Sequence, residues 1–253
     1  MTVKELYLFL NEKIPPSLSC PWDNDGLMCC PDPDAAVRRV LVALDMTEDV
    51  VKTAVSGGYD LILSHHPLIF KPIKAINDDN HVARKIIKLL EGGVSVFSFH
   101  TRADKVVGGV NDSLCDLLGM YNTAPFGEGM LGRIGDLDDS LDLEDFAYRV
   151  KTVLGADSLR ISDAYNPVSR VAIVGGDGKD FVKAAIEAGA DTYVSGRIGY
   201  NVMAEAPEMG LNMIEAGHYF TEQPVTEFFR DLLLDLDSDL YVEIASSNVI
   251  KVI

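Results

Sequence analysis

An internal repeat is the sequence feature that most constrains the fold. Residues 39–64 align without a gap with residues 170–195, at a spacing of 131 positions. The identical pairs include Asp60 with Asp191 and Ser64 with Ser195. Each segment has the pattern of a strand, a helix and a second strand. The repeat therefore predicts an α/β protein built from a duplicated β-α-β unit, with parallel strands and a right-handed crossover in each copy.

Hydrophobic periodicity predicts the remaining elements. Further helices are expected at about 2–13, 80–91, 142–154 and from about 221, and further strands at 94–99, 211–216 and 240–244. Thr2 and Glu5 have the spacing of a capping box at the first of these helices. Residues 122–140 are rich in glycine and aspartate without clear periodicity, so they are expected to be the junction between a lobe of about residues 1–125 and a lobe of about 126–253.

Two adjacent histidines end the second strand of the first copy. The chain contains five histidines, and His65 and His66 follow the apolar run 61–63 directly. Neutral imidazole is a common ligand of zinc, iron, nickel and copper. Successive side chains of an extended backbone point in opposite directions, and Pro67 keeps His66 extended. The pair is therefore expected to reach two metal ions.

A second motif places acids at a fixed spacing from histidines. His100 and Asp104 form H-x-x-x-D after one predicted strand, and His218 and Glu222 form H-x-x-x-E after another, 118 positions later. Ligands of open α/β sheets bind at the carboxyl ends of the strands. His100 is expected either to be a sixth ligand or to orient Asp104, whereas His81 is expected to be a solvated helix residue.

Together these positions predict a two-metal site. Three imidazoles and two carboxylates suit two divalent cations of the zinc, iron or manganese kind, and two such cations can share and deprotonate a water. Glu222 is the expected bridging and catalytic residue. The predicted metal ligands are His65, His66, Asp104, His218 and Glu222.

Composition excludes several other classes. The net charge of −17 argues against binding to nucleic acid, and no apolar run approaches the roughly 18 residues of a membrane span. The N-terminus lacks the pattern of a secretory signal. The four cysteines form no C-x-x-C pair and no disulfide-framework spacing, which indicates a reducing cytoplasm with the thiols as small apolar filler.

Two loops have alternative interpretations. Residues 175–180 contain Gly-Lys, but Asp180 stands where a phosphate-binding loop has Ser or Thr, so a turn is expected. The turn-rich loop 21–27 holds the single tryptophan, Trp22, which is expected to be buried as an anchor. Asp23 and Asn24 would then lie at the rim of a site.

Five motifs, taken together, resemble the Nif-three-like family, whose members are often named GTP cyclohydrolase I type-two homologues. The motifs occur in the family's order over nearly the whole chain, and they are 22–27, 64–67, 100–104, 108–112 and 217–222. The resemblance implies an interlocked two-lobe α/β fold, ring-shaped homohexamers, and a dinuclear metal site with the same five ligands.

The chain departs from the family pattern at three positions. Arg197 and Asn201 stand where the family has an acid and often a histidine, and Arg102 replaces an asparagine. The two arginines would either favour a phosphate or carboxylate substrate or make surface ion pairs.

Two classes of function follow. The leading hypothesis is a metal-dependent hydrolase acting on a small, nucleotide-like substrate, and GTP cyclohydrolase is the activity that the resemblance implies. The alternative is a non-enzymatic, metal-binding hexameric assembly or adaptor. Nucleic acid processing, a third class, is disfavoured by the acidic charge.

Overall fold

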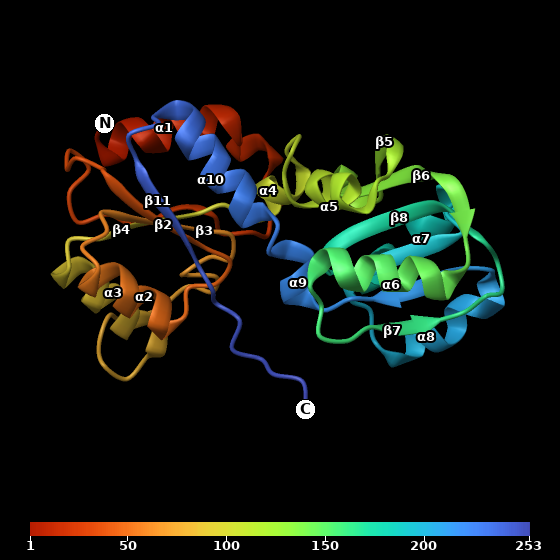
Figure 1. Cartoon of the computed structure of the whole chain (residues 1–253). Helices are drawn as coiled ribbons and strands as arrows, with labels where there is room; N and C mark the ends of the chain where they lie inside the picture. The colour runs from red at the N-terminus through yellow and green to blue at the C-terminus, as the bar shows by residue number, and fades with distance from the viewer. The chain divides into compact units, whose positions relative to one another are not determined.

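Two β-sheets, each with helices on both faces, organise the chain in a computed structural model that describes residues 1–253 (Figure 1). The first unit consists of Met1–Val106 and Val225–Val249, and the second of Val107–Pro224 and Ile250–Ile253. The predicted α/β class is thus confirmed, and helices flank both sheets. None of the helices combines the length and the apolar character needed to cross a membrane.

The first unit is built on a five-stranded sheet. Its elements are α1 (Val3–Lys13), η1 (Pro16–Leu18), β1 (Gly26–Cys29), β2 (Arg39–Ala43), α2 (Glu48–Ser56), β3 (Leu61–Ser64), α3 (His81–Glu91), β4 (Ser95–Ser98), α4 (Thr101–Lys105), α10 (Val225–Leu236) and β11 (Tyr241–Ala245). The strand order is β1-β4-β3-β2-β11, and only β1 runs antiparallel to its neighbour. Helices α2 and α3 cover one face, and α1 and α10 cover the other (Figure 1).

The second unit is built on a six-stranded sheet. Its elements are α5 (Val110–Leu118), β5 (Tyr121–Phe126), η2 (Glu128–Met130), β6 (Gly132–Leu141), α6 (Leu143–Leu154), β7 (Arg160–Ser162), β8 (Val168–Asp177), η3 (Lys179–Phe181), α7 (Val182–Glu187), β9 (Thr192–Arg197), α8 (Tyr200–Glu205), η4 (Ala206–Met209), β10 (Asn212–Glu215) and α9 (His218–Glu222). The order is β5-β6-β8-β9-β10-β7, with β8, β9 and β10 parallel.

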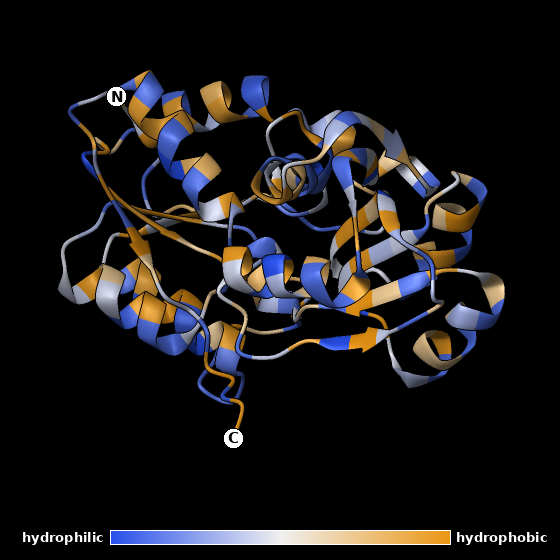
Figure 2. Ribbon diagram, turned by 45° about the vertical axis from the view of Figure 1, so that its right-hand side comes forward, coloured by the Kyte–Doolittle hydropathy of each residue, from blue (hydrophilic) through white to orange (hydrophobic).

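Amphipathic helices close a core on each sheet. In the first unit, buried Val50, Val51 and Ile86 of α2 and α3 pack against the strands, and in the second, Val182 and Met203 of α7 and α8 do the same. Hydrophobic bands alternate with hydrophilic ones along the helices, as expected for helices with one face on a sheet (Figure 2).

The internal repeat is present in the hydrogen bonding. In β2–β3, Val40 pairs with Leu61, and in β8–β9, Val171 pairs with Thr192, both 131 positions later. The Asp60 carboxylate accepts backbone N–H bonds of 2.8 and 2.9 Å from residues 38 and 39. The Asp191 carboxylate accepts the equivalent bonds, 2.9 and 2.8 Å, from residues 169 and 170. The two copies therefore share strand register as well as sequence.

Two features differ from the sequence prediction. Residues 122–140 are not an irregular junction, because most of them form the antiparallel pair β5–β6. A Cβ at Gly132 would lie 2.3 Å from the Phe126 ring, so the glycine that obscured the strand pattern is required by close cross-strand packing. The unit division also differs from two contiguous lobes, since β11 returns to pair with β2.

Local signals were more reliable. Thr2 and Glu5 form the predicted capping box, Thr47 caps α2, and Gly155 ends α6 in the left-handed conformation. His81 is exposed, as predicted. All four cysteines are free thiols. The prediction of a buried Trp22 is wrong, because its side chain is 64% exposed.

Candidate metal centre

Three histidines converge at the carboxyl ends of β3 and β4 in the first unit. His65 and His66 follow the last residue of β3, and His100 precedes α4, two residues after β4 ends. One ring nitrogen from each of the three lies within 4.8 Å of the others. The parallel pairing of β3 with β4 brings these strand ends to one edge of the sheet. We refer to His65, His66 and His100 as the three-histidine cluster.

The Nδ1 atom of each histidine is held by an oxygen atom. His65 Nδ1 donates to the Phe99 carbonyl at 3.0 Å. His66 Nδ1 donates to the Asp45 carboxylate at 2.7 Å, and His100 Nδ1 donates to the Asp23 carboxylate at 2.8 Å. Since these oxygens accept, each Nδ1 carries the proton and each Nε2 presents its lone pair. Metal-binding histidines are oriented in this way by a carbonyl or carboxylate behind the ring.

Asp104 supplies a carboxylate beside the cluster. It lies in α4 and is 8% exposed, and its Oδ1 atom is 3.6 Å from His65 Nε2. This distance is too long for a hydrogen bond. Two ligands of one tetrahedral cation, with bonds of about 2.0–2.2 Å, lie about 3.3–3.6 Å apart. The spacing of Asp104 and His65 therefore suits a shared cation.

Asp23 fixes the loop that carries His100. Its carboxylate also accepts bonds from the Thr101 backbone at 3.0 Å and the Thr101 hydroxyl at 2.6 Å. Burial raises the pKa of Asp23, but the bonds from His100 and Thr101 outweigh it and lower the pKa below its usual range. For His100, burial lowers the pKa, but the hydrogen bond to Asp23 and the nearby Asp104 charge raise it, and the net result is a raised pKa. Asp23 thus lies behind the cluster rather than at an open rim.

A second donor pair lies in the second unit. His218 and Glu222 occupy the first and last positions of α9, and His218 Nε2 is 2.8 Å from Glu222 Oε2. Glu222 is 4% exposed. The Thr221 hydroxyl fixes α9 to β8, because it accepts a bond from the Gly176 backbone at 3.0 Å. We refer to these two residues as the His218–Glu222 pair.

Two glycines make room for this pair. A Cβ at Gly176 would lie 2.0 Å from Glu222 Oε1 and 3.3 Å from His218 Nε2. A Cβ at Gly196 would lie 2.8 Å from the His218 Cα. Gly176 also has a φ of +68°, which L side chains rarely adopt. The absence of a Cβ at Gly176 and Gly196 therefore leaves the space that the His218–Glu222 pair occupies.

The structure therefore brings the predicted residues together within each unit. The first unit joins His65, His66 and Asp104, and adds His100 as a third imidazole. The second unit joins His218 and Glu222. The sequence interpretation missed Asp45, whose position at the carboxyl end of a predicted strand was an available signal. It also missed the role of Gly176.

The two arginines that replace family residues have different environments. Arg102 is 1% exposed and bonds Asp25, Asn11 and a carbonyl, so it is an internal anchor rather than an anion receptor. Arg197 is exposed and lies 3.9 Å from Asp177. Arg102 therefore meets neither expectation, whereas Arg197 makes the surface ion pair of the second alternative.

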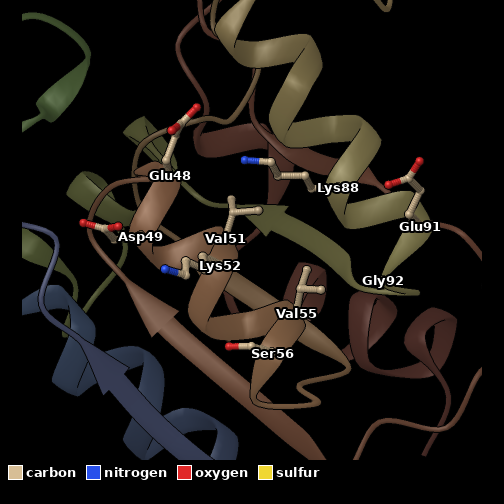
Figure 3. A pocket seen from close by; sticks show the side chains of 9 residues that line it. All are labelled: Glu48, Asp49, Val51, Lys52, Val55, Ser56, Lys88, Glu91 and Gly92. Carbon is tan, nitrogen blue, oxygen red and sulfur yellow. The ribbon is translucent and has the colours of Figure 1, made fainter. Parts of the chain in front are cut away.

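A separate groove lies between α2 and α3 and has a volume of about 520 Å³ (Figure 3). Val51 and Val55 form its apolar part, and lysines and acids surround them. The groove contains no histidine or cysteine. It therefore offers a much poorer donor set for a transition metal than the three-histidine cluster.

The donors fit divalent zinc, iron or manganese. Imidazole suits zinc and iron, and carboxylate suits manganese and iron. Three features agree with binding of such a cation. They are the oriented imidazoles, the distance of Asp104 from His65, and the space that Gly176 leaves for Glu222. The three-histidine cluster alone contains enough nitrogen donors for one cation with an open position.

Comparisons with known proteins cover nearly the whole chain. The family model described as Duf34/NIF3 (NGG1p interacting factor 3) matches residues 1–252. A protein of Clostridium perfringens named GTP cyclohydrolase 1 type 2 homolog is 34% identical over 248 residues, covering 95% of this chain and 94% of that protein. A protein of the same name from Lactococcus lactis is 34% identical over 242 residues, covering 94% and 93%.

Two solved structures have a similar fold. A hypothetical protein of Staphylococcus aureus aligns with a TM-score of 0.89 at 26% identity, covering 100% of this chain and 99% of that one. Reduced HcgD from Methanocaldococcus jannaschii aligns with a TM-score of 0.84 at 29% identity, covering 97% of each chain. The likeness therefore includes both sheets.

Proposed function

Because this chain belongs to the DUF34/NIF3 family, we propose that it is a dinuclear metal-dependent hydrolase acting on a small, nucleotide-like substrate. The names of its relatives suggest GTP cyclohydrolase chemistry as the reaction to test first. One observation carries the proposal: three imidazoles in the first unit converge, and an oxygen atom holds the Nδ1 atom of each.

The proposed ligands come from both units. His65, His66 and Asp104 would supply donors from the first unit, and His218 and Glu222 would supply donors from the second. His100 is a further donor of the same kind as His65 and His66. When bound, two divalent cations would act as Lewis acids and lower the pKa of a coordinated water toward neutrality.

The chain's own residues have distinct tasks in this proposal. Asp45 and Asp23 hold the Nδ1 atoms of His66 and His100 and so fix the orientation of both rings. Glu222 is the proposed catalytic carboxylate. Its contact with His218 holds both side chains in position before a cation arrives, and Thr221 anchors the helix that carries them.

The test measures metal content and turnover in the same samples. The protein, purified anaerobically, is analysed for metals and assayed with GTP and a panel of phosphoesters and cyclic amides. We expect about two metal equivalents per chain and turnover that is lost in His65→Ala and Glu222→Gln. His81→Ala removes an exposed histidine and is the matched control.

Two results would count against the proposal. Less than one metal equivalent per chain would remove the dinuclear centre. Full metal content without turnover on any substrate, together with transfer of metal to an apo-acceptor, would favour the non-enzymatic alternative. His218→Ala tests whether the units contribute to one centre, because it should then lower metal affinity at the three-histidine cluster. The homohexamer stays a separate proposal, to be measured by sedimentation.

A further inference from the structure

Two exposed aromatic side chains border the three-histidine cluster within the first unit. Trp22 is 64% exposed and Phe70 is 47% exposed. Their ring centroids lie 6.3 Å apart at an interplanar angle of 79°. The Trp22 ring lies 6.2 Å from the His100 ring, and the Phe70 ring lies 6.1 Å from it. Both rings therefore contact a member of the cluster while keeping much of their surface in water.

The backbone beneath both rings is fixed. Asp23, next to Trp22, accepts bonds from His100 and Thr101. Asn24 donates to the carbonyl of Ile69, the residue before Phe70, and so joins the two loops. A single exposed aromatic residue is ordinary on a protein surface. Two such rings on anchored loops, edge to face with each other and with a candidate metal ligand, form a specific arrangement.

We propose that Trp22 and Phe70 form a stacking site for a planar heteroaromatic ring of the substrate, beside the three-histidine cluster. This inference rests on the proposed hydrolase function and specifies its substrate class. Edge-to-face contacts among Trp22, Phe70 and His100 leave the exposed face of an aromatic ring available for an incoming ring.

The arrangement separates ring recognition from the reaction. Stacking depends on a π-face and little on the identity of the base. It would hold one part of the substrate beside the residues that would bind the cations. The two aromatic residues would thus determine affinity for the ring, and the histidines and acids would determine metal content.

Trp22 provides its own reporter, because it is the only tryptophan in the chain. The metal-loaded full chain is titrated with guanosine, adenosine, neopterin and nicotinamide as rings, with tripolyphosphate as an anion without a ring, and with GTP as both. Indole fluorescence and calorimetry are recorded together. We expect at least one ring compound to bind and quench the indole, and tripolyphosphate to leave the fluorescence unchanged.

Variants then assign the effect to the two side chains. Trp22→Ala, Phe70→Ala and Phe70→Leu should each weaken ring binding by roughly 5- to 100-fold, measured by calorimetry. The leucine variant keeps an apolar side chain without the π-face. Tyr148→Ala removes a comparably exposed aromatic ring from α6 and should leave ring affinity unchanged. Because all three side chains are exposed, the variants should remain folded, and circular dichroism checks this.

The outcomes separate this inference from the metal proposal. Absence of binding by all four rings to wild type, or an affinity in Trp22→Ala and Phe70→Ala within about twofold of wild type, would overturn it. A change in sedimentation without a change in ring affinity would instead assign the patch to contacts between copies, and would also overturn it. If the protein binds about two metal equivalents but none of the rings, the stacking site is contradicted while the proposed metal centre is retained.

Discussion

The two β-α-β copies share a frame but supply donors from different elements. In the first copy, Asp45, His65 and His66 lie one or two residues past the ends of β2 and β3. The equivalent positions in the second copy, 131 residues later, are Gly176, Gly196 and Arg197. Two of these are glycines with no room for a Cβ, because α9 packs against them with His218 and Glu222.

The difference teaches that the 131-residue repeat preserves strand register but not the donors after its strands, whereas the H-x-x-x-acid motif recurs in both copies, at α4 and at α9. In both copies an aspartate at the equivalent position, Asp60 or Asp191, accepts two backbone N–H bonds at the start of the first strand. In the first copy the strand ends themselves carry imidazoles. In the second copy the equivalent positions are two glycines and an exposed arginine, and its donors lie only on helix α9. One frame therefore presents donors to the same edge of a sheet in two ways.

The largest expected effect comes from adding a Cβ where the second copy requires none. Gly176→Ala should lower the free energy of unfolding by about 2–5 kcal/mol, because it combines an unfavourable positive φ with a clash against Glu222. Urea denaturation measures this. Gly189→Ala is the matched control, with a φ of +84° and no atom within 4 Å of the new Cβ, and should lose only about 1 kcal/mol. Equal losses of unfolding free energy in the two variants would show that the contact between a Cβ at position 176 and Glu222 has no cost of its own.

The next prediction exchanges equivalent positions after the strands. His66→Ala should weaken metal binding by more than about 100-fold, since it removes a proposed ligand whose orienting partners alone are worth 10- to 100-fold. Arg197→Ala, at the equivalent position of the second copy, should leave metal affinity unchanged because the Arg197 side chain is exposed and its guanidinium lies 3.9 Å from Asp177. Competition with a chromogenic chelator measures both. Similar affinities in the two variants would contradict the assignment of donors.

A smaller effect is expected behind the first copy's histidines. Asp45→Asn should weaken metal binding by about 10- to 100-fold, because it removes the charge that holds the His66 ring. Asp49→Asn removes the same charge from the exposed start of α2 and should have little effect on metal affinity. An Asp45→Asn protein with wild-type metal affinity would mean that the contact with His66 is not needed for ligand orientation.

The smallest effect tests the shared frame itself. Asp60→Asn and Asp191→Asn should each cost about 1 kcal/mol of unfolding free energy, since an amide oxygen can still accept but loses the charge assistance. Thermal or urea unfolding of both variants measures the costs. Asp78→Asn, which removes the same charge from an exposed loop, controls for surface charge. A loss of unfolding free energy in only one of the two variants would show that the Asp60 and Asp191 contacts do not contribute equally to stability.

Much of the fold followed from local sequence signals. Strand and helix periods, together with the caps at Thr2, Thr47 and Gly155, place most elements to within a few residues. The pattern failed at β5 and β6, where glycines required by neighbouring side chains interrupt the alternation. It also misjudged Trp22, because a tryptophan's usual burial says nothing about one that faces solvent beside a candidate site.

The sequence by itself determined the duplicated frame and which histidines and acids stand at strand ends, because strand direction and side-chain chemistry are local properties. Only the tertiary structure decided which oxygens accept from those histidines. They are the Phe99 carbonyl for His65, the Asp45 carboxylate for His66 and the Asp23 carboxylate for His100. It also decided that β11 returns to β2. These contacts join residues far apart in the chain, and their selection depends on sheet order and packing, which no single segment encodes.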